Sequence, residues 1–137
     1  MTRMIFINLP VADLSRSIRF YASIGANQNM QFSDERTACM LLSDSIGVML
    51  LTHDRYRDFI SRPIGDAHAE SQLLMALTME SRDAVNATVD KGAAGGGRAD
   101  PTPQQDHGFM FSRSLEDPDG YVWELMWMDM SAVPPQA

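Results

Sequence analysis

The order of secondary-structure elements predicted for the first half of the chain is repeated in the second half, and this repeat limits the fold more than any other feature. Each half begins with a strand, continues with a helix and ends with two or three strands. A helix that connects two strands of one sheet predicts a mixed sheet with helices on one face, and hence an α+β fold. We expect two such curved sheets to enclose a pocket on the faces opposite the helices. The predicted division is a single domain over 1–137, with a first module at 1–61, a connector at 62–71, a second module at 72–130 and a tail at 131–137.

Local signals define the elements of the first module. An apolar run at 4–9 predicts a strand that ends at Pro10, and Asp13 is a favourable N-cap for a helix over 14–24. Gly25 is placed to end that helix, because glycine readily adopts the left-handed conformation found after helix C-termini. The other elements expected here are strands at 37–43 and 46–52, joined by a short turn, and one or two helical turns at 54–61.

The second module repeats these signals. A strand at 72–80 precedes Ser81, which is a favourable N-cap for a helix over 82–94, and three glycines at 95–97 end that helix. The remaining strands are expected at 98–102, 109–115 and 121–129, the last two joined by a turn that contains Pro118 and Gly120.

Composition and charge argue against several functional classes. Among 137 residues, 11 basic and 18 acidic side chains give a formal net charge of −7, and the sequence has no basic stripe suited to nucleic acid. No apolar run approaches the roughly 20 residues that a membrane-spanning helix needs. The single cysteine, Cys39, cannot form a disulfide within the chain. We therefore expect a cytoplasmic protein that binds neither nucleic acid nor membrane.

Two motifs lie near opposite ends of the chain. Residues 11–21 read V-A-D-L-S-R-S-I-R-F-Y, and residues 116–125 read E-D-P-D-G-Y-V-W-E-L. Both resemble motifs of the vicinal oxygen chelate superfamily, which includes glyoxalase I, bleomycin-resistance proteins and extradiol dioxygenases. The resemblance covers about residues 4–129. It implies two βαβββ modules with helices on the outer face, and usually a homodimer.

The metal enzymes of this superfamily hold a divalent ion with four side chains, one from a strand in each quarter of the fold. Carried onto this sequence by position relative to the motifs, the four places are Phe6, Leu50, Leu74 and Glu124. Hydrocarbon side chains cannot ligate an ion, because metals such as Ni²⁺ and Zn²⁺ need nitrogen, oxygen or sulfur lone pairs. Only Glu124 could serve as a ligand. We therefore expect neither a metal nor another cofactor.

Alternation of side chains along each strand predicts which residues share a pocket with these four places. The expected pocket residues are Phe6, Asn8, Leu50, Thr52, Leu74, Thr78, Glu124 and Met126. The intervening residues, Met49 among them, are expected to pack under the helices. The result would be an apolar cavity with a few polar groups, which is typical of small-molecule sites.

Glu124 is the only candidate acid or base in the expected pocket. It could pair with Asn8, Thr78 or Arg113, it could bind a cationic or hydroxyl-bearing ligand, or it could act as a general base without a metal. The three histidines are expected at a strand end or in loops and are His53, His68 and His107.

Three functional hypotheses follow. The first is a metal-free protein that binds an unidentified small molecule, as the resemblance to bleomycin-resistance proteins implies. The acidic net charge would favour a cationic ligand. The alternative is a metal-dependent lyase or isomerase of the lactoylglutathione lyase type. The third is a dimeric scaffold whose pocket is filled by its own side chains. At this point the question of catalysis stays open.

Overall fold

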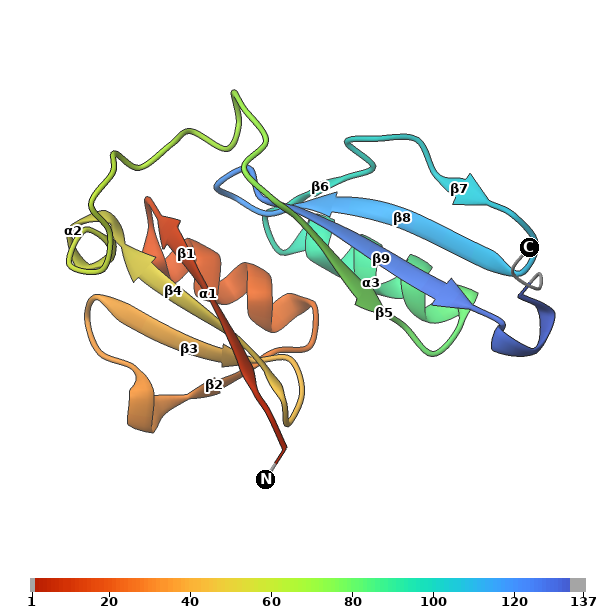
Figure 1. Ribbon diagram of the computed structural model, residues 1–137, viewed down its shortest axis with the longest axis horizontal. Helices are drawn as coiled ribbons and strands as arrows, with labels where there is room; N and C mark the ends of the chain where they lie inside the picture. Colours follow the sequence, from red (N-terminus) through yellow and green to blue (C-terminus); the bar gives the residue numbers. More distant parts are fainter. Residues whose placement is uncertain (1, 134–137) are drawn as a thin grey trace.

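The computed structural model describes residues 2–133 and contains two β-sheets joined by a connector (Figure 1). The first sheet has the strand order β1-β4-β3-β2, and the second has the order β5-β9-β8-β6, with β7 paired to β8. The strands of the first sheet are β1 (Ile5–Val11), β2 (Asn27–Asn29), β3 (Thr37–Leu41) and β4 (Ile46–Thr52). Those of the second are β5 (Leu74–Thr78), β6 (Arg98–Ala99), β7 (Gln105–Asp106), β8 (Met110–Glu116) and β9 (Val122–Met128). The helices are α1 (Leu14–Ser23), α2 (His53–Tyr56) and α3 (Arg82–Ala94), with 3-10 turns at Met30–Phe32 and Met130–Ala132.

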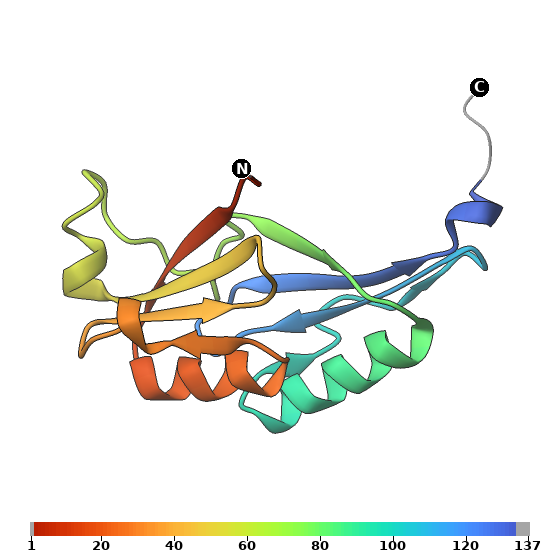
Figure 2. The ribbon, with the colours of Figure 1, turned by 90° about the horizontal axis from the view of Figure 1, so that it is seen from below.

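Both sheets are mixed, as predicted. β1 pairs in parallel with β4 and β5 in parallel with β9, whereas the other strand pairs are antiparallel. Figure 2 shows α1 and α3 on the same side of the two sheets, so the opposite side of each sheet is open. The two helices also contact each other. The α+β class with helices on one face is therefore confirmed. No helix within residues 2–133 has the length and apolar character needed to cross a membrane.

Side-chain caps fix the start of both long helices. The Asp13 carboxylate accepts a hydrogen bond from the Arg16 backbone N–H at 3.1 Å, and the Ser81 hydroxyl accepts one from the Ala84 N–H at 3.0 Å. Each cap satisfies a backbone donor that the first helical turn leaves without a partner. Gly25, which follows α1, has the left-handed φ of 103° that favours glycine. The caps predicted from the sequence are thus confirmed.

Several strands differ in length from the prediction, most clearly β1, β5 and β6, of which β6 covers only 98–99 of the predicted 98–102. β1 continues through Pro10 to Val11 instead of ending at the proline. This is possible because β1 is an edge strand, where a missing backbone donor on the outer side costs little. β5 covers only 74–78 of the predicted 72–80, so the connector is longer than expected.

Two short strands are absent from the prediction. β2 and β7 have the polar sequences Asn27–Asn29 and Gln105–Asp106, which have low β-propensity and no apolar alternation. These segments form strands because neighbouring strands pair with them: β2 pairs with β3, and β7 pairs with β8. The predicted tail at 131–137 overlaps a 3-10 turn, and residues 134–137 lie outside the described residues.

A buried hydrogen-bond network joins the two sequence motifs on the helix side of the molecule. The Tyr21 hydroxyl donates to Asp117 Oδ2 at 2.6 Å and accepts from the Trp123 indole N–H at 3.1 Å. All three residues are at most 2% exposed. Burial raises the pKa of Asp117 to about 6, and burial together with the Asp117 charge raises that of Tyr21 well above its usual value. The motifs therefore hold the two halves of the fold together.

A second link lies beside this network. The Asp119 carboxylate accepts hydrogen bonds from the Ala12 backbone N–H at 2.9 Å and from the Ser17 hydroxyl at 3.1 Å. The turn that ends the second motif thus binds the segment that begins the first helix. Its Gly120 has a φ of 98° and packs against the connector, since a Cβ there would lie 2.6 Å from the His68 backbone nitrogen.

Candidate ligand-binding site

The open face of the first sheet is formed by side chains from β1, β3 and β4. The register pairs Phe6 with Gly47 and Asn8 with Met49 across the parallel strands, and Cys39 with Met49 across the antiparallel pair. Directly paired residues point to the same side of a sheet. Phe6, Asn8, Cys39 and Met49 therefore share the open face.

A cavity of about 400 Å³ lies over this face and is lined by Phe6, Asn8, Phe32, Cys39 and Met49. Phe32 enters from the 3-10 turn before β3 and is 61% exposed, while Phe6 is 45% exposed. The Asn8 amide N–H donates to the Phe6 carbonyl at 3.2 Å. Burial raises the pKa of the Cys39 thiol, so the thiolate needed for nucleophilic chemistry is disfavoured. The walls of this cavity are thus largely apolar and suited to binding.

Leu50 and Thr52 do not lie on the open face, and their predicted placement there is wrong. Leu50 pairs with Leu9 and Thr52 with Val11, so both point toward the helix side. Leu50 is fully buried in the core that includes Phe20. Met49, which was expected under the helices, takes the open position. The prediction is wrong by one residue. Residues 46–52 are mostly apolar on both faces, so the sequence does not indicate which face is buried.

The open face of the second sheet brings together the other expected pocket residues. The register pairs Leu74 with Val122, Ala76 with Glu124 and Thr78 with Met126. Leu74, Thr78, Glu124 and Met126 therefore share this face, and Leu74 is 62% exposed. The cavity over the first sheet contains none of these four residues. The expected pocket is thus divided between two sheets.

Arg113 is not available as a partner for Glu124. It pairs with Leu125 across β8 and β9, whereas Glu124 pairs with Ser114, so the two side chains lie on opposite faces. The Arg113 guanidinium instead donates to Asp100 at 2.7 Å and to Asn86 of α3 at 3.0 Å. These contacts raise the pKa of Arg113 and lower that of Asp100. This ion pair belongs to the packing of α3 on the sheet.

The open faces do not offer the ligand set of a divalent metal. Of the four places expected for ligands, Phe6, Leu50 and Leu74 carry hydrocarbon side chains, and Glu124 alone has an oxygen donor. Met49, which takes the open position in place of Leu50, offers a thioether. Ni²⁺, Zn²⁺ and Fe²⁺ sites in proteins usually require three or more nitrogen, oxygen or thiolate ligands. Within residues 2–133, no group of three or more His, Cys, Asp or Glu side chains is arranged to hold an ion.

The histidines lie at a strand end or in loops, as expected. His53 begins α2, His107 is exposed beside β7, and His68 lies in the connector. The His68 ring donates from Nε2 to the Pro118 carbonyl at 3.2 Å, because a carbonyl oxygen can only accept. Sequence reasoning missed Phe32, Cys39 and Met49 as cavity residues. Phe32 belongs to a 3-10 turn that carries no periodic signal, and the other two follow from strand register, which the sequence leaves ambiguous.

Comparison with known proteins gives the family. Residues 3–125 match the profile of the Glyoxalase/Bleomycin resistance protein/Dioxygenase superfamily. The chain belongs to this superfamily. None of the curated protein sequences matches it. Superfamily membership therefore rests on a match over most of the chain, in agreement with the two motifs.

Several solved structures share the fold. A glyoxalase-related enzyme from Fulvimarina pelagi superposes with a TM-score of 0.77 at 17% identity, covering 100% of this chain and 94% of that one. A hypothetical protein from S. aureus gives a TM-score of 0.76 at 17% identity, with coverage of 93% and 95%. A glyoxylase/bleomycin resistance protein/dioxygenase domain from Frankia sp. EAN1pec gives 0.67 at 21% identity, with coverage of 93% and 93%. At these identities the similarity establishes the fold alone.

Proposed function

We propose that this superfamily member binds a small apolar organic molecule on its open sheet faces without a divalent metal. The observation that carries the proposal is the cavity of about 400 Å³ over the first sheet, with Phe6, Phe32 and Met49 in its walls. Small-molecule sites are typically apolar hollows with a few polar groups that set orientation. Asn8 supplies an amide here, and among the side chains of residues 2–133 no group of three or more His, Cys, Asp or Glu could hold an ion. Metal loss is thus part of the proposal.

The proposal includes a homodimer, because the open faces expose more apolar surface than a monomer in water favours. Phe6, Phe32 and Leu74 are 45%, 61% and 62% exposed. Removing apolar surface from water contributes roughly 25 cal/mol per Å². A second copy that brings the Leu74 and Glu124 face of one chain over the Phe6 and Met49 face of the other would cover both and close the cavity. Glu124 would then orient a hydroxyl or cationic group of the ligand.

The first test is binding of a neutral fluorescent probe, N-phenyl-1-naphthylamine, to the full chain. We expect saturable binding that Met49→Arg abolishes, because the substitution places a long cation in the cavity. Met130→Arg is the matched control, since Met130 is 75% exposed and lies outside the cavity lining. Binding that is indifferent to Met49→Arg would refute the site. Sedimentation of the same samples tests the dimer.

The second test is metal analysis of untagged protein followed by titration with Ni²⁺, Zn²⁺, Mn²⁺ and, without oxygen, Fe²⁺. We expect no stoichiometric metal and no saturable binding. One tightly bound ion per chain that is lost in Glu124→Ala would contradict the proposal. That result would favour instead the metal-dependent lyase or isomerase function.

A further inference from the structure

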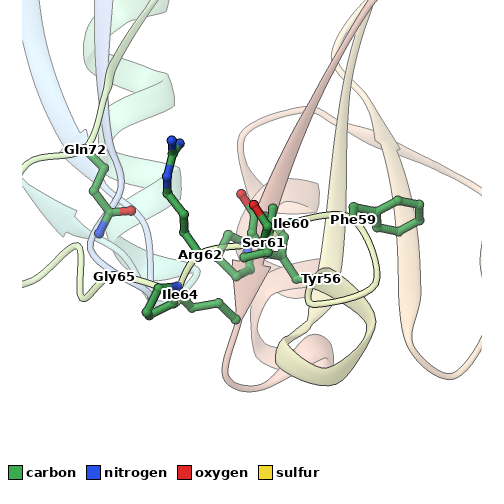
Figure 3. A pocket seen from close by; sticks show the side chains of 10 residues that line it. Tyr56, Phe59, Ile60, Ser61, Arg62, Ile64, Gly65 and Gln72 are labelled. Atoms are coloured by element: carbon green, nitrogen blue, oxygen red, sulfur yellow. The ribbon is translucent and has the colours of Figure 1, made fainter.

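Two adjoining cavities lie along the connector, away from the cavity over the first sheet. Their volumes are about 350 and 360 Å³, and both are lined by Pro10, Ile64 and Gly65. Figure 3 shows the first of them, with Tyr56 and Ile60 on one side and Gln72 on the other. Because they share lining residues, one elongated ligand could occupy both. We call them the apolar cavity (the first) and the cationic cavity (the second).

The cationic cavity is named for its two arginines, which line it together with Asp66 and Asp119. Arg16 of α1 and Arg57, just after α2, both line it. The Arg16 Nε is buried and has no hydrogen-bond partner within residues 2–133. Its Nη2 lies 3.6 Å from Asp119 Oδ1, beyond good hydrogen-bond distance. Arg57 is exposed and forms no ion pair in the described part of the chain.

The two carboxylates of this cavity already accept hydrogen bonds from the protein. Asp119 accepts from the Ala12 N–H at 2.9 Å and the Ser17 hydroxyl at 3.1 Å. Asp66 accepts from the His68 backbone N–H at 3.0 Å. The carboxylates thus order the connector and the turn, while the Arg16 and Arg57 guanidinium groups retain donors for an acceptor from outside. The Arg16 side chain is 39% exposed although its Nε is buried, so a ligand anion would contact the terminal guanidinium nitrogens of Arg16.

The apolar cavity is named for its aromatic and aliphatic side chains, which lie beside Ser61, Arg62 and Gln72. Tyr56, Phe59, Ile60 and Ile64 line it, and Arg62 is its one ionisable cation. Phe59 is 62% exposed, held under the Arg55 guanidinium at 4.4 Å from the ring centre. An aromatic or aliphatic group placed here would remove this surface from water.

We propose that the two cavities form a second binding site, which takes an organic carboxylate with an aromatic body. The carboxylate would lie in the cationic cavity, where its planar geometry matches a guanidinium fork, and the ring would lie in the apolar cavity. The site shares no lining residue with the cavity of the proposed function, so either can stand or fall independently.

The experiment is calorimetric titration of the full chain with 4-phenylbutyrate at low ionic strength, where charge contacts are least screened. We expect one saturable site per chain. The uncharged 4-phenylbutanamide should bind at least about tenfold more weakly, because it lacks the carboxylate. Acetate should show no saturation, because it lacks the aromatic ring. Equal binding of the acid and the amide would overturn the proposal, as would no saturable binding of the acid. Inorganic phosphate that binds more tightly than 4-phenylbutyrate would also overturn the assignment to a carboxylate.

Matched variants locate the binding. Arg57→Gln should weaken 4-phenylbutyrate about tenfold, since Arg57 is exposed and its loss leaves the fold intact. Arg19→Gln is the control, because it makes the same charge change on exposed α1 surface outside both cavities. If both variants weakened the binding of 4-phenylbutyrate equally, the binding would depend on net charge alone and the proposed site would be refuted. Binding of N-phenyl-1-naphthylamine should be the same in both variants, which separates this test from that of the proposed function.

Discussion

The two sides of the first sheet consist of similar residues but differ in packing. On the helix side, Leu9, Val48 and Leu50 are at most 2% exposed. On the open side, Phe6 is 45% exposed and Met49 lines a cavity, although both are as apolar as their neighbours. The two sides do not differ in hydrophobicity. They differ in packing because the helices cover only one of them. Apolar residues on the open side are therefore available to a ligand or a second chain.

The open side of the second sheet differs again, because it mixes polar and apolar groups. Glu124 lies between Ala76 and Ser114, and the Ser114 hydroxyl is itself held at 2.9 Å from that of Thr102. The same backbone plan thus presents an apolar surface in one half and a partly polar surface in the other. Substitutions on the two sides should accordingly affect different properties, with stability depending on the helix side and binding on the open side.

The largest contrast is expected between two adjacent residues of β4. Leu50→Ala should lower the free energy of unfolding by about 2–5 kcal/mol, because it leaves a void in the core. Met49→Ala should change it by less than about 1 kcal/mol and instead weaken binding of the neutral probe. Urea denaturation of the two variants, monitored by tryptophan fluorescence, gives both values. If Met49→Ala were the more destabilising substitution, the assignment of the two faces would be reversed.

This pair also marks the limit of what the sequence predicts. The caps Asp13 and Ser81 are strong local signals, and the two helices that follow them start where expected. The face occupied by Leu50 is not a local property, because it depends on which residue of β1 pairs with Gly47. In the second half, small or polar side chains recur on one face of β5 and β9 at Ala76, Thr78 and Glu124, and this is the face predicted for them. Alternation is informative only where the two faces differ in polarity.

A pH-dependent effect is expected at the buried junction on the helix side. Asp117 has a pKa of about 6 in the folded protein against 3.8 for an ordinary aspartate, since burial disfavours its charged form. Its contribution to stability is fully present below about pH 3.8 and is lost as the pH rises through 6. This difference in pKa corresponds to about 3 kcal/mol.

Comparison with Asp117→Asn isolates this contribution, because asparagine keeps the shape and does not ionise. The difference in unfolding free energy, wild type minus variant, should fall by about 2 kcal/mol between pH 4 and pH 7, which is most of the full effect. Carboxylates with lowered pKa values, such as Asp106 at about 2, are present in both proteins and cancel in the difference. A difference that stays constant over this range would show that the buried carboxylate does not titrate there.

The smallest effect on stability is expected for the carboxylate on the open side. Glu124→Gln should change the free energy of unfolding by less than about 0.5 kcal/mol, because Glu124 is partly exposed and forms no ion pair within residues 2–133. If Glu124 orients a ligand, the variant should keep its affinity for N-phenyl-1-naphthylamine, because this probe has no cationic or alcohol group for the carboxylate to bind. It should lose affinity for a cationic aromatic probe such as phenethylammonium by about tenfold, the typical cost of one charge-assisted hydrogen bond. Equal loss of both probes would mean that Glu124 shapes the cavity, and a large loss of stability would place it with Asp117 among the residues that hold the fold together.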